Sequence, residues 1–225
     1  MILKLIMGFL AVIFVGGMGW GLGGFTKGSS DNHVAEVNGA VISKAEYDRN
    51  YQRTYKLYRD LLQDNFKEEM VRNFVIESLV EKKLWFQASH EMGLSVSLEE
   101  LQNAILYSPS FQDRGRFDPE VYRLVLKQNG LTPEIFENTL REELLIEKGK
   151  NTIRDAVVLT ESEISEAETT VKTNGKDKAV SPDQRALEEA KAMKDLLQQK
   201  RQRAVLAYQE NLKASSTIHI EQKFL

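Results

Sequence analysis

The chain has 225 residues, 42% of them hydrophobic and 28% charged, which is a globular composition. A formal net charge of −3 argues against a nucleic-acid partner, and the absence of cysteine excludes a disulfide framework or a thiolate site. The three histidines, at positions 33, 90 and 219, have no metal-ligand spacing, and the glycine-rich run lies inside an apolar segment, where it cannot cradle a phosphate. We therefore expect no metal, no cofactor and no catalytic residues.

An uncharged apolar run from Leu5 through Thr26 opens the chain. Its about 22 residues exceed the core of a secretory signal, about 7–15 residues, and match the roughly 20 that a membrane-spanning helix needs. We expect residues 1–26 to form a transmembrane anchor, with a cleaved signal as the alternative that glycines 16–24 leave open. Lys4 before the run orients the N-terminus toward the cytoplasm and the rest across the membrane. Gly17 and Gly21 have the spacing of a homodimer face, although glycines also accumulate in membrane helices generally.

A polar spacer, residues 27–33, separates the run from a small predicted sheet. Two short apolar runs in residues 34–42 flank Asn38-Gly39, a dipeptide typical of a type I′ hairpin turn because both of its residues tolerate positive φ. Near the chain's other end, residues 216–222 alternate isoleucine with polar side chains. We expect this third strand to pair with the hairpin and so to bring both ends of the domain 34–225 together.

Between these strands the sequence predicts helices, several of which begin at a capping box. A long C-terminal helix over residues 183–213 has only a narrow apolar stripe, which is typical of packing on one side. The fold class is therefore mainly α with a small sheet. The remaining helices are expected at residues 44–63, 67–91, 98–106, from 119, 133–154 and from 161.

The stretch from Phe111 to Glu137 fixes two helix starts closely. Asp118-Pro119 and Thr132-Pro133 each place an N-cap before a proline at the first helical position, and Asn129-Gly130 ends the helix between them. Most of the large side chains here are expected to form a core, and a minority to line an exposed apolar surface. The candidates for that binding surface are Tyr107, Phe111, Phe117, Tyr122, Leu126 and Phe136.

Charged clusters on the predicted helices favour solvated faces over chemistry. Adjacent acidic pairs such as Glu142-Glu143 point apart on a helix, so we do not expect them to act as paired catalytic carboxylates. The basic cluster from Lys200 to Arg203 is likewise interpreted as a solvated face, with an acidic partner as the alternative.

The apolar N-terminus, the start VAEVNGAVISKAEYDR and the block from Phe111 to Leu145 resemble the chaperone domain of SurA/PpiD-type periplasmic folding factors. The resemblance covers roughly residues 1–165 and returns in the final helix and strand. It implies a SurA N-terminal-like chaperone domain in residues 34–225. It also implies a single-pass protein of the bacterial inner membrane, with this domain in the periplasm and unfolded or nascent exported polypeptides as partners.

The sequence departs from this family in one place. Relatives with isomerase activity insert a parvulin-type prolyl isomerase domain after the segment that corresponds to residues 159–168. Here only residues 171–181 stand between the last short helix and the long one, whereas a separate domain needs on the order of a hundred residues. We therefore expect a membrane-anchored chaperone without enzyme activity. A scaffold that recruits one partner is the alternative, and a residual prolyl isomerase is a third interpretation.

Overall fold

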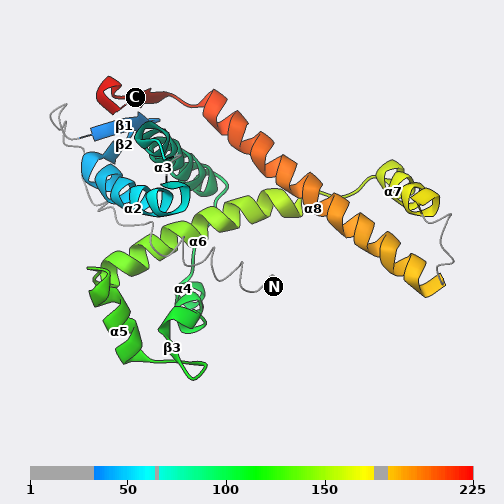
Figure 1. The fold of residues 1–225 in the computed structure, drawn as a ribbon, viewed down its shortest axis with the longest axis horizontal. Coiled ribbons are helices and arrows are strands. Elements are labelled where there is room, and N and C mark those ends of the chain that lie inside the picture. Colours follow the sequence, from blue (N-terminus) through cyan, green and yellow to red (C-terminus); the bar gives the residue numbers. More distant parts are fainter. Residues whose placement is uncertain (1–32, 64–65, 175–181, 225) are drawn as a thin grey trace.

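The computed structural model describes residues 33–63, 66–174 and 182–224 and shows a mainly helical protein with a small sheet (Figure 1). The predicted membrane span lies outside these residues, and within them no helix is both long and apolar enough to cross a bilayer. The strands are β1 His33–Val37, β2 Ala40–Ser43, β3 Gln112–Asp113, β4 Arg116–Phe117 and β5 Ile218–Ile220. The α-helices are α2 Lys44–Leu62, α3 Glu68–Glu91, α4 Leu98–Leu106, α5 Pro119–Gln128, α6 Pro133–Asp155, α7 Glu161–Asn174 and α8 Pro182–Ser215, with short 3₁₀ turns η2 Pro109–Phe111 and η3 Gln222–Phe224.

The sheet has the order β2-β1-β5, with both pairs antiparallel. Asn38 and Gly39 have φ of 50° and 83°, which is the geometry that the hairpin turn requires. Asn38 also exchanges backbone and side-chain hydrogen bonds with Thr217, each 2.9 Å long, immediately before β5. The predicted hairpin and its pairing with the terminal strand are therefore confirmed.

The sheet packs with α2 and α3 into what we call the sheet lobe, residues 33–91 and 216–224. The tyrosines that step along one side of α2 meet α3 and the sheet: Tyr47 is buried, and Tyr51, Tyr55 and Tyr58 pack against the same core. Val71, Val75, Ile76, Leu79 and Val80 contribute the α3 side of this core. The narrow apolar face of each helix is thus covered once the two lie side by side.

A second, smaller unit, the small lobe, contains α4, η2, β3, β4, α5 and the first half of α6. Asp118 Oδ1 accepts hydrogen bonds from the amides of Glu120 and Val121, and Thr132 Oγ1 accepts one from Ile135, so both predicted caps are present. Gly130 adopts φ of 67° just after α5, which confirms the predicted helix stop. The short hairpin β3–β4, with Arg114 and Gly115 at positive φ, was not predicted.

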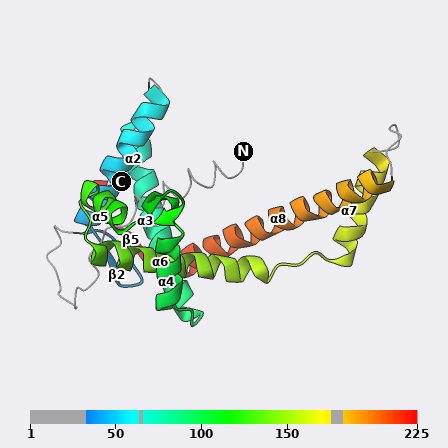
Figure 2. The same cartoon turned by 90° about the horizontal axis from the view of Figure 1, so that it is seen from below.

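Helix α6 joins the two lobes, and α8 crosses it on the way back to the sheet (Figure 1). At the crossing, Trp85 of α3, Ile146 of α6 and Val205 of α8 form a buried cluster. Beyond the crossing, α7 and the first half of α8 form an arm, residues 156–174 and 182–200, that projects away from both lobes (Figure 2). The chain thus has two lobes and an arm around one three-helix junction.

The absence of a side chain at Gly149 lets α3 and α6 approach closely at this junction. If residue 149 had a Cβ atom, it would lie 2.2 Å from Ser89 Oγ and 3.2 Å from Ser89 Cβ, which is too close. Ser89 is buried, and its hydroxyl donates to the Trp85 carbonyl oxygen at 2.7 Å. We expect Gly149→Ala to lower the free energy of unfolding by about 1–2 kcal/mol despite the better helix propensity of alanine. Urea unfolding followed by circular dichroism measures this. The loss should shrink when Ser89→Ala is already present, and a Gly149→Ala protein at least as stable as the wild type would contradict the close approach.

Candidate functional site

The six side chains predicted for a binding surface converge in the small lobe, but most of them form its core. Phe111, Leu126 and Phe136 are buried, and Phe111 stacks edge-to-face on both Tyr122 and Phe136, with centroid distances of 4.9 and 5.4 Å. These three buried side chains are therefore not presented at the surface, because a lobe this small needs its large aromatic groups to fill its own interior. Phe117 and Tyr122 are half-buried. Of the six, Tyr107 alone is strongly exposed, at 76%.

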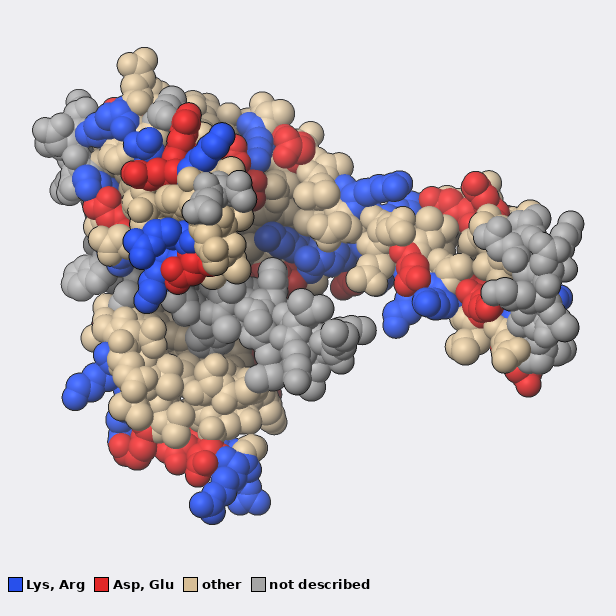
Figure 3. All heavy atoms as spheres, viewed as in Figure 1, with Lys and Arg blue, Asp and Glu red and all other residues tan. Residues whose placement is uncertain are grey.

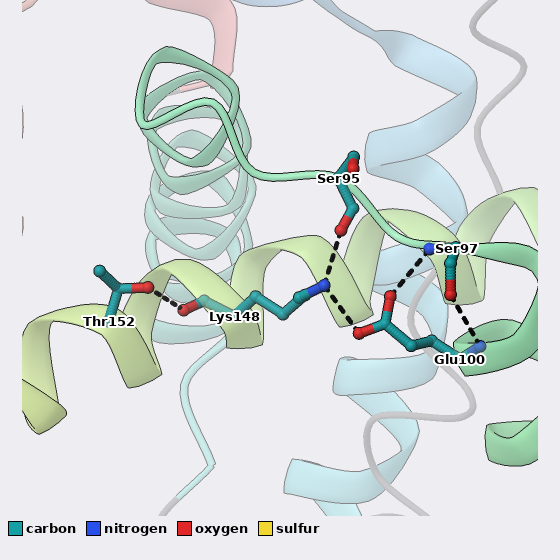
Figure 4. Close-up of polar contacts among 5 residues, drawn as sticks. All are labelled: Ser95, Ser97, Glu100, Lys148 and Thr152. Atoms are coloured by element: carbon teal, nitrogen blue, oxygen red, sulfur yellow. Dashed lines mark hydrogen bonds and ion pairs between the residues drawn. The ribbon is translucent and has the colours of Figure 1, made fainter.

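The small lobe is fixed to α6 by an ion pair (Figure 4). Lys148 Nζ donates to Glu100 Oε1 and to the Ser95 carbonyl oxygen, both at 2.7 Å. Glu100 also closes the capping box of α4, because it accepts from the amide of Ser97 at 2.8 Å while Ser97 Oγ accepts from the amide of Glu100. The hydrogen bond from Lys148, with that from Ser97, lowers the pKa of Glu100. The start of α4 is thus held in one orientation against α6.

A groove lies where the sheet lobe meets α6. Its lining comes from three helices: Glu46 of α2; Leu79, Lys82, Lys83 and Phe86 of α3; and Glu142 of α6. The enclosed space is small, about 30 Å³, or room for roughly one or two water molecules. Lys82 and Glu142 approach within 3.5 Å across it. This concavity lies between α2, α3 and α6, and not between the small lobe and the long helix.

Glu143, beside the groove on α6, has an unusual electrostatic environment. Burial raises its pKa to about 7, and the neighbouring carboxylate Glu142 acts in the same direction. Lys82 and Arg53 oppose this rise, since each favours the charged form. Burial also lowers the pKa of Arg53 itself. Glu143 is half-buried, so the prediction that the Glu142-Glu143 pair is a solvated face does not hold fully for this residue.

Exposed apolar side chains also lie along α2. Glu46 and Arg53 are seven residues apart, and Leu57 and Leu61 follow at intervals of four, so all four lie on one side of the helix. Leu57 and Leu61 are 43% and 69% exposed. Leu57 and Leu61 thus form an exposed apolar strip near the end of α2, about 16 and 22 Å along the helix axis from Glu46, and so lie well outside the groove.

Further exposed apolar groups are distributed over other helices. Figure 3 shows a largely uncharged face on the small lobe, whereas charges of both signs cover the sheet lobe and the arm. The exposed large side chains of α4, α5, α8 and the segment before α7 are Leu98, Leu106, Tyr107, Leu124, Val158, Leu187 and Leu206. Such scattered apolar area, in place of one deep pocket, suits contact with an extended chain at several points.

The arm is attached at its base by lysine and arginine contacts. Lys200 Nζ donates to Glu163 Oε2 at 2.7 Å and to the Val158 carbonyl oxygen at 3.0 Å, and Arg201 lies 3.8 Å from Asp155. The hydrogen bonds from Lys200 and Thr160 lower the pKa of Glu163 to about 2. The interpretation of this basic cluster as a solvated face is thus wrong for Lys200 and Arg201, which hold the turn before α7 onto α8.

No metal centre is found among the residues that the structure describes: none of their histidine or acidic side chains gather in a group of three suited to an ion. His33 and His219 both lie near Glu221, at 3.0 and 3.9 Å, whereas His90 lies on α3 against Phe86.

Known proteins share this architecture. The family model for the SurA-like N-terminal domain matches residues 1–150. The periplasmic chaperone PpiD of Haemophilus influenzae is 28% identical over 169 residues, which are 72% of this chain and 27% of that protein. PpiD of Escherichia coli K12 is 26% identical over 174 residues, 74% of this chain and 27% of that protein. The chain therefore matches only about a quarter of the length of these curated relatives.

The fold agrees with a solved structure as well. A chain from the work on PEB4 and Cj1289, two SurA-like chaperones of Campylobacter jejuni, superposes with a TM-score of 0.55 at 12% identity and covers 85% of this chain and 100% of its own. At this identity the likeness establishes a common fold. Because the family model matches residues 1–150, more than half of the chain, the chain belongs to the family of SurA-like N-terminal domains.

Proposed function

We propose that this protein is a membrane-anchored periplasmic chaperone that holds unfolded or partly folded exported polypeptides. The observation that carries the proposal is the exposed apolar strip of Leu57 and Leu61 near the end of α2. Exposed leucines gain free energy when they are covered, at about 25 cal/mol for each Å² of apolar area. A client strand that covers this strip needs no particular sequence, only apolar side chains at suitable intervals.

The same proposal assigns the parts of the chain. Residues 1–26 anchor the protein in the inner membrane, residues 27–33 are a spacer, and residues 34–225 form the chaperone domain in the periplasm. A spacer of this length reaches at most about 25 Å, so it holds the sheet lobe close to the bilayer. Tethering raises the effective concentration of the binding surface where exported chains emerge. A homodimer formed through the anchor glycines would increase it further.

The proposed activity is binding without catalysis. The connection between α7 and α8, residues 175–181, is far shorter than the roughly hundred residues of a separate isomerase domain. The small lobe supports this binding role through its rigid walls, with Tyr107 exposed and Phe117 and Tyr122 half-buried beside it. Its buried members, Phe111, Leu126 and Phe136, would support the surface from beneath.

Light scattering from an aggregating unfolded protein tests the proposal, with the full chain in lipid nanodiscs and empty nanodiscs as the blank. We expect suppression at a few-fold molar excess, and Leu57→Ser combined with Leu61→Ser should weaken it by about three- to tenfold in the concentration required. Val41→Ser is the control, because Val41 is 51% exposed on β2, a different element from the strip. A double variant as effective as the wild type would remove the strip from the proposal.

The alternative, a scaffold for one dedicated partner, makes a different prediction for a pull-down from a periplasmic extract. A chaperone should retain many proteins, and more of them after heat stress, whereas a scaffold should retain one in a fixed ratio. Acceleration of cis–trans exchange in a proline peptide, a step that otherwise takes tens of seconds or longer, would instead indicate an isomerase.

A further inference from the structure

Asn38, in the turn between β1 and β2, joins three parts of the sheet lobe through its side chain. Its Nδ2 donates to Gln87 Oε1 of α3 at 3.0 Å and to Ser216 Oγ, just after α8, at 3.1 Å. Its Oδ1 accepts from the amide of Thr217, just before β5, at 2.9 Å. Since a backbone N–H can only donate, this last contact fixes which end of the side-chain amide is the oxygen. The hairpin turn is therefore bonded both to α3 and to the chain segment that leads into β5.

Asn38 is also followed by Gly39, and this dipeptide is prone to spontaneous deamidation because glycine has no side chain to hinder attack by its backbone nitrogen. In that reaction the Gly39 nitrogen attacks Asn38 Cγ and loses its proton, and the new C–N bond closes a succinimide ring. The Cγ–Nδ2 bond breaks, and the leaving nitrogen takes up the proton and departs as ammonia. Water then opens the ring to aspartate or isoaspartate. Both residues are exposed, so water can reach them.

We propose that Asn38 is a deamidation site that is guarded by β5 and α3. Attack requires Asn38 Cγ to swing onto the Gly39 nitrogen, and the hydrogen bonds that hold the side-chain amide on α3 and beside β5 oppose this movement. The rate of deamidation therefore follows the fraction of time for which the end of the chain is detached from the hairpin turn. The guard operates whether or not the protein binds clients.

The product of the reaction cannot restore the guard. Aspartate has no side-chain N–H, so both donated hydrogen bonds are lost and its carboxylate lies against Gln87 Oε1, which is another acceptor. Turning the Gln87 amide round would sacrifice the hydrogen bond from its Nε2 to the Val37 carbonyl oxygen, 3.1 Å long. Isoaspartate also lengthens the backbone inside the turn, which disturbs the pairing of β1 with β2. Each deamidated molecule therefore holds β5 more weakly.

A second Asn-Gly pair provides an internal reference. Asn129-Gly130 follows α5, and Asn129 Nδ2 donates to the Val125 carbonyl oxygen of that helix at 2.8 Å. Fraying of the helix end exposes this pair to the same reaction without any change in β5. A variant that weakens the guard should thus accelerate deamidation at Asn38 and leave the rate at Asn129 unchanged.

Peptide mapping by mass spectrometry tests the guard, because it measures the conversion of amide to acid at both asparagines of the full chain in nanodiscs. At mildly alkaline pH we expect Asn38 to react at least about tenfold more slowly than in a free synthetic peptide of residues 34–42. Ser216→Ala removes one of the hydrogen bonds and should raise the rate at Asn38 about two- to tenfold. Ser215→Ala is the matched control, since Ser215 Oγ donates to carbonyl oxygens within α8, and it should leave the rate unchanged.

Hydrogen exchange tests the consequence for β5. Asn38→Asp reproduces the aspartate product, and it should speed the exchange of the β5 amides about tenfold, the effect of losing one or two hydrogen bonds. Unchanged exchange would show that the product holds β5 as well as asparagine does.

Three results would overturn the guard. The first is an Asn38 that reacts as fast in the protein as in the free peptide, and the second is a rate that Ser216→Ala does not change. The third is an equal acceleration at Asn129, which would mean that Ser216→Ala loosens the whole protein and not the attachment of β5.

Discussion

Trp85→Ala is expected to lower the free energy of unfolding by about 3–5 kcal/mol, the usual loss for truncating a buried tryptophan. Trp85 is 1% exposed, and from α3 it packs against α6 and α8, the other two helices of the junction. Its ring lies 5.4 Å from that of Tyr208 on α8, and Lys150 Nζ of α6 stands 5.6 Å from its centroid. Its Nε1 donates to Gln209 Oε1 at 3.2 Å. The substitution therefore leaves a cavity and also removes a hydrogen-bond donor from a part-buried amide.

Chemical unfolding followed by circular dichroism measures this loss, with two comparisons. Trp85→Phe keeps most of the apolar area and should cost about 1–2 kcal/mol. Phe74→Ala truncates an aromatic side chain of the same helix that is 47% exposed, and it should cost less than about 1 kcal/mol. Hydrogen exchange should also show α8 losing protection in Trp85→Ala before the small lobe does. A Trp85→Ala protein within 1 kcal/mol of the wild type would show that α8 does not depend on this cluster.

The parts of the fold that were predictable from sequence are those that neighbouring residues determine. Asn38-Gly39 specifies its turn without help from the rest of the chain, and the Ser97–Glu100 capping box closes within four residues. Proline at the first position of α5 and α6 marks their starts equally locally. The hairpin β3–β4 was missed because its turn places Arg114 at positive φ, a conformation for which arginine gives no signal.

The site was harder to predict, because its geometry comes from pairs of residues far apart in the chain. Lys148 pairs with Glu100, which is 48 residues away in the chain, and Lys200 pairs with Glu163, which is 37 residues away. Because the partners are so far apart, neither pair leaves a pattern that can be recognised in one sequence. The aromatic residues, in contrast, were visible in the sequence, but their location in the core or at the surface was not. Phe111 and Phe136 are of the residue type expected at a binding surface, but in a small lobe the same large side chains fill the core. Whether Tyr107 contacts clients stays a prediction.

Glu143→Gln is expected to stabilise the protein at pH 8 by about 1–3 kcal/mol and to change its stability little at pH 5. In the folded protein, burial raises the pKa of Glu143 to about 7 from its ordinary value of 4.5. The folded state thus binds the proton more tightly than the unfolded chain, so the wild type loses stability as the pH rises from about 4.5 to 7. A difference of one pKa unit corresponds to 1.36 kcal/mol, and the half-buried position of the carboxyl reduces the full effect.

Glutamine removes the ionisation and keeps the shape, so the difference between variant and wild type should grow across this pH window and level off above it. Urea midpoints at several pH values between 5 and 8.5 measure the difference, since every other titrating group is common to both proteins. Glu142→Gln is the informative neighbour, because it removes the partner of Lys82 and should destabilise the protein slightly at pH 8, opposite in sign to Glu143→Gln. A constant difference between Glu143→Gln and wild type across the window would mean that Glu143 is hydrated and normally charged in the folded protein.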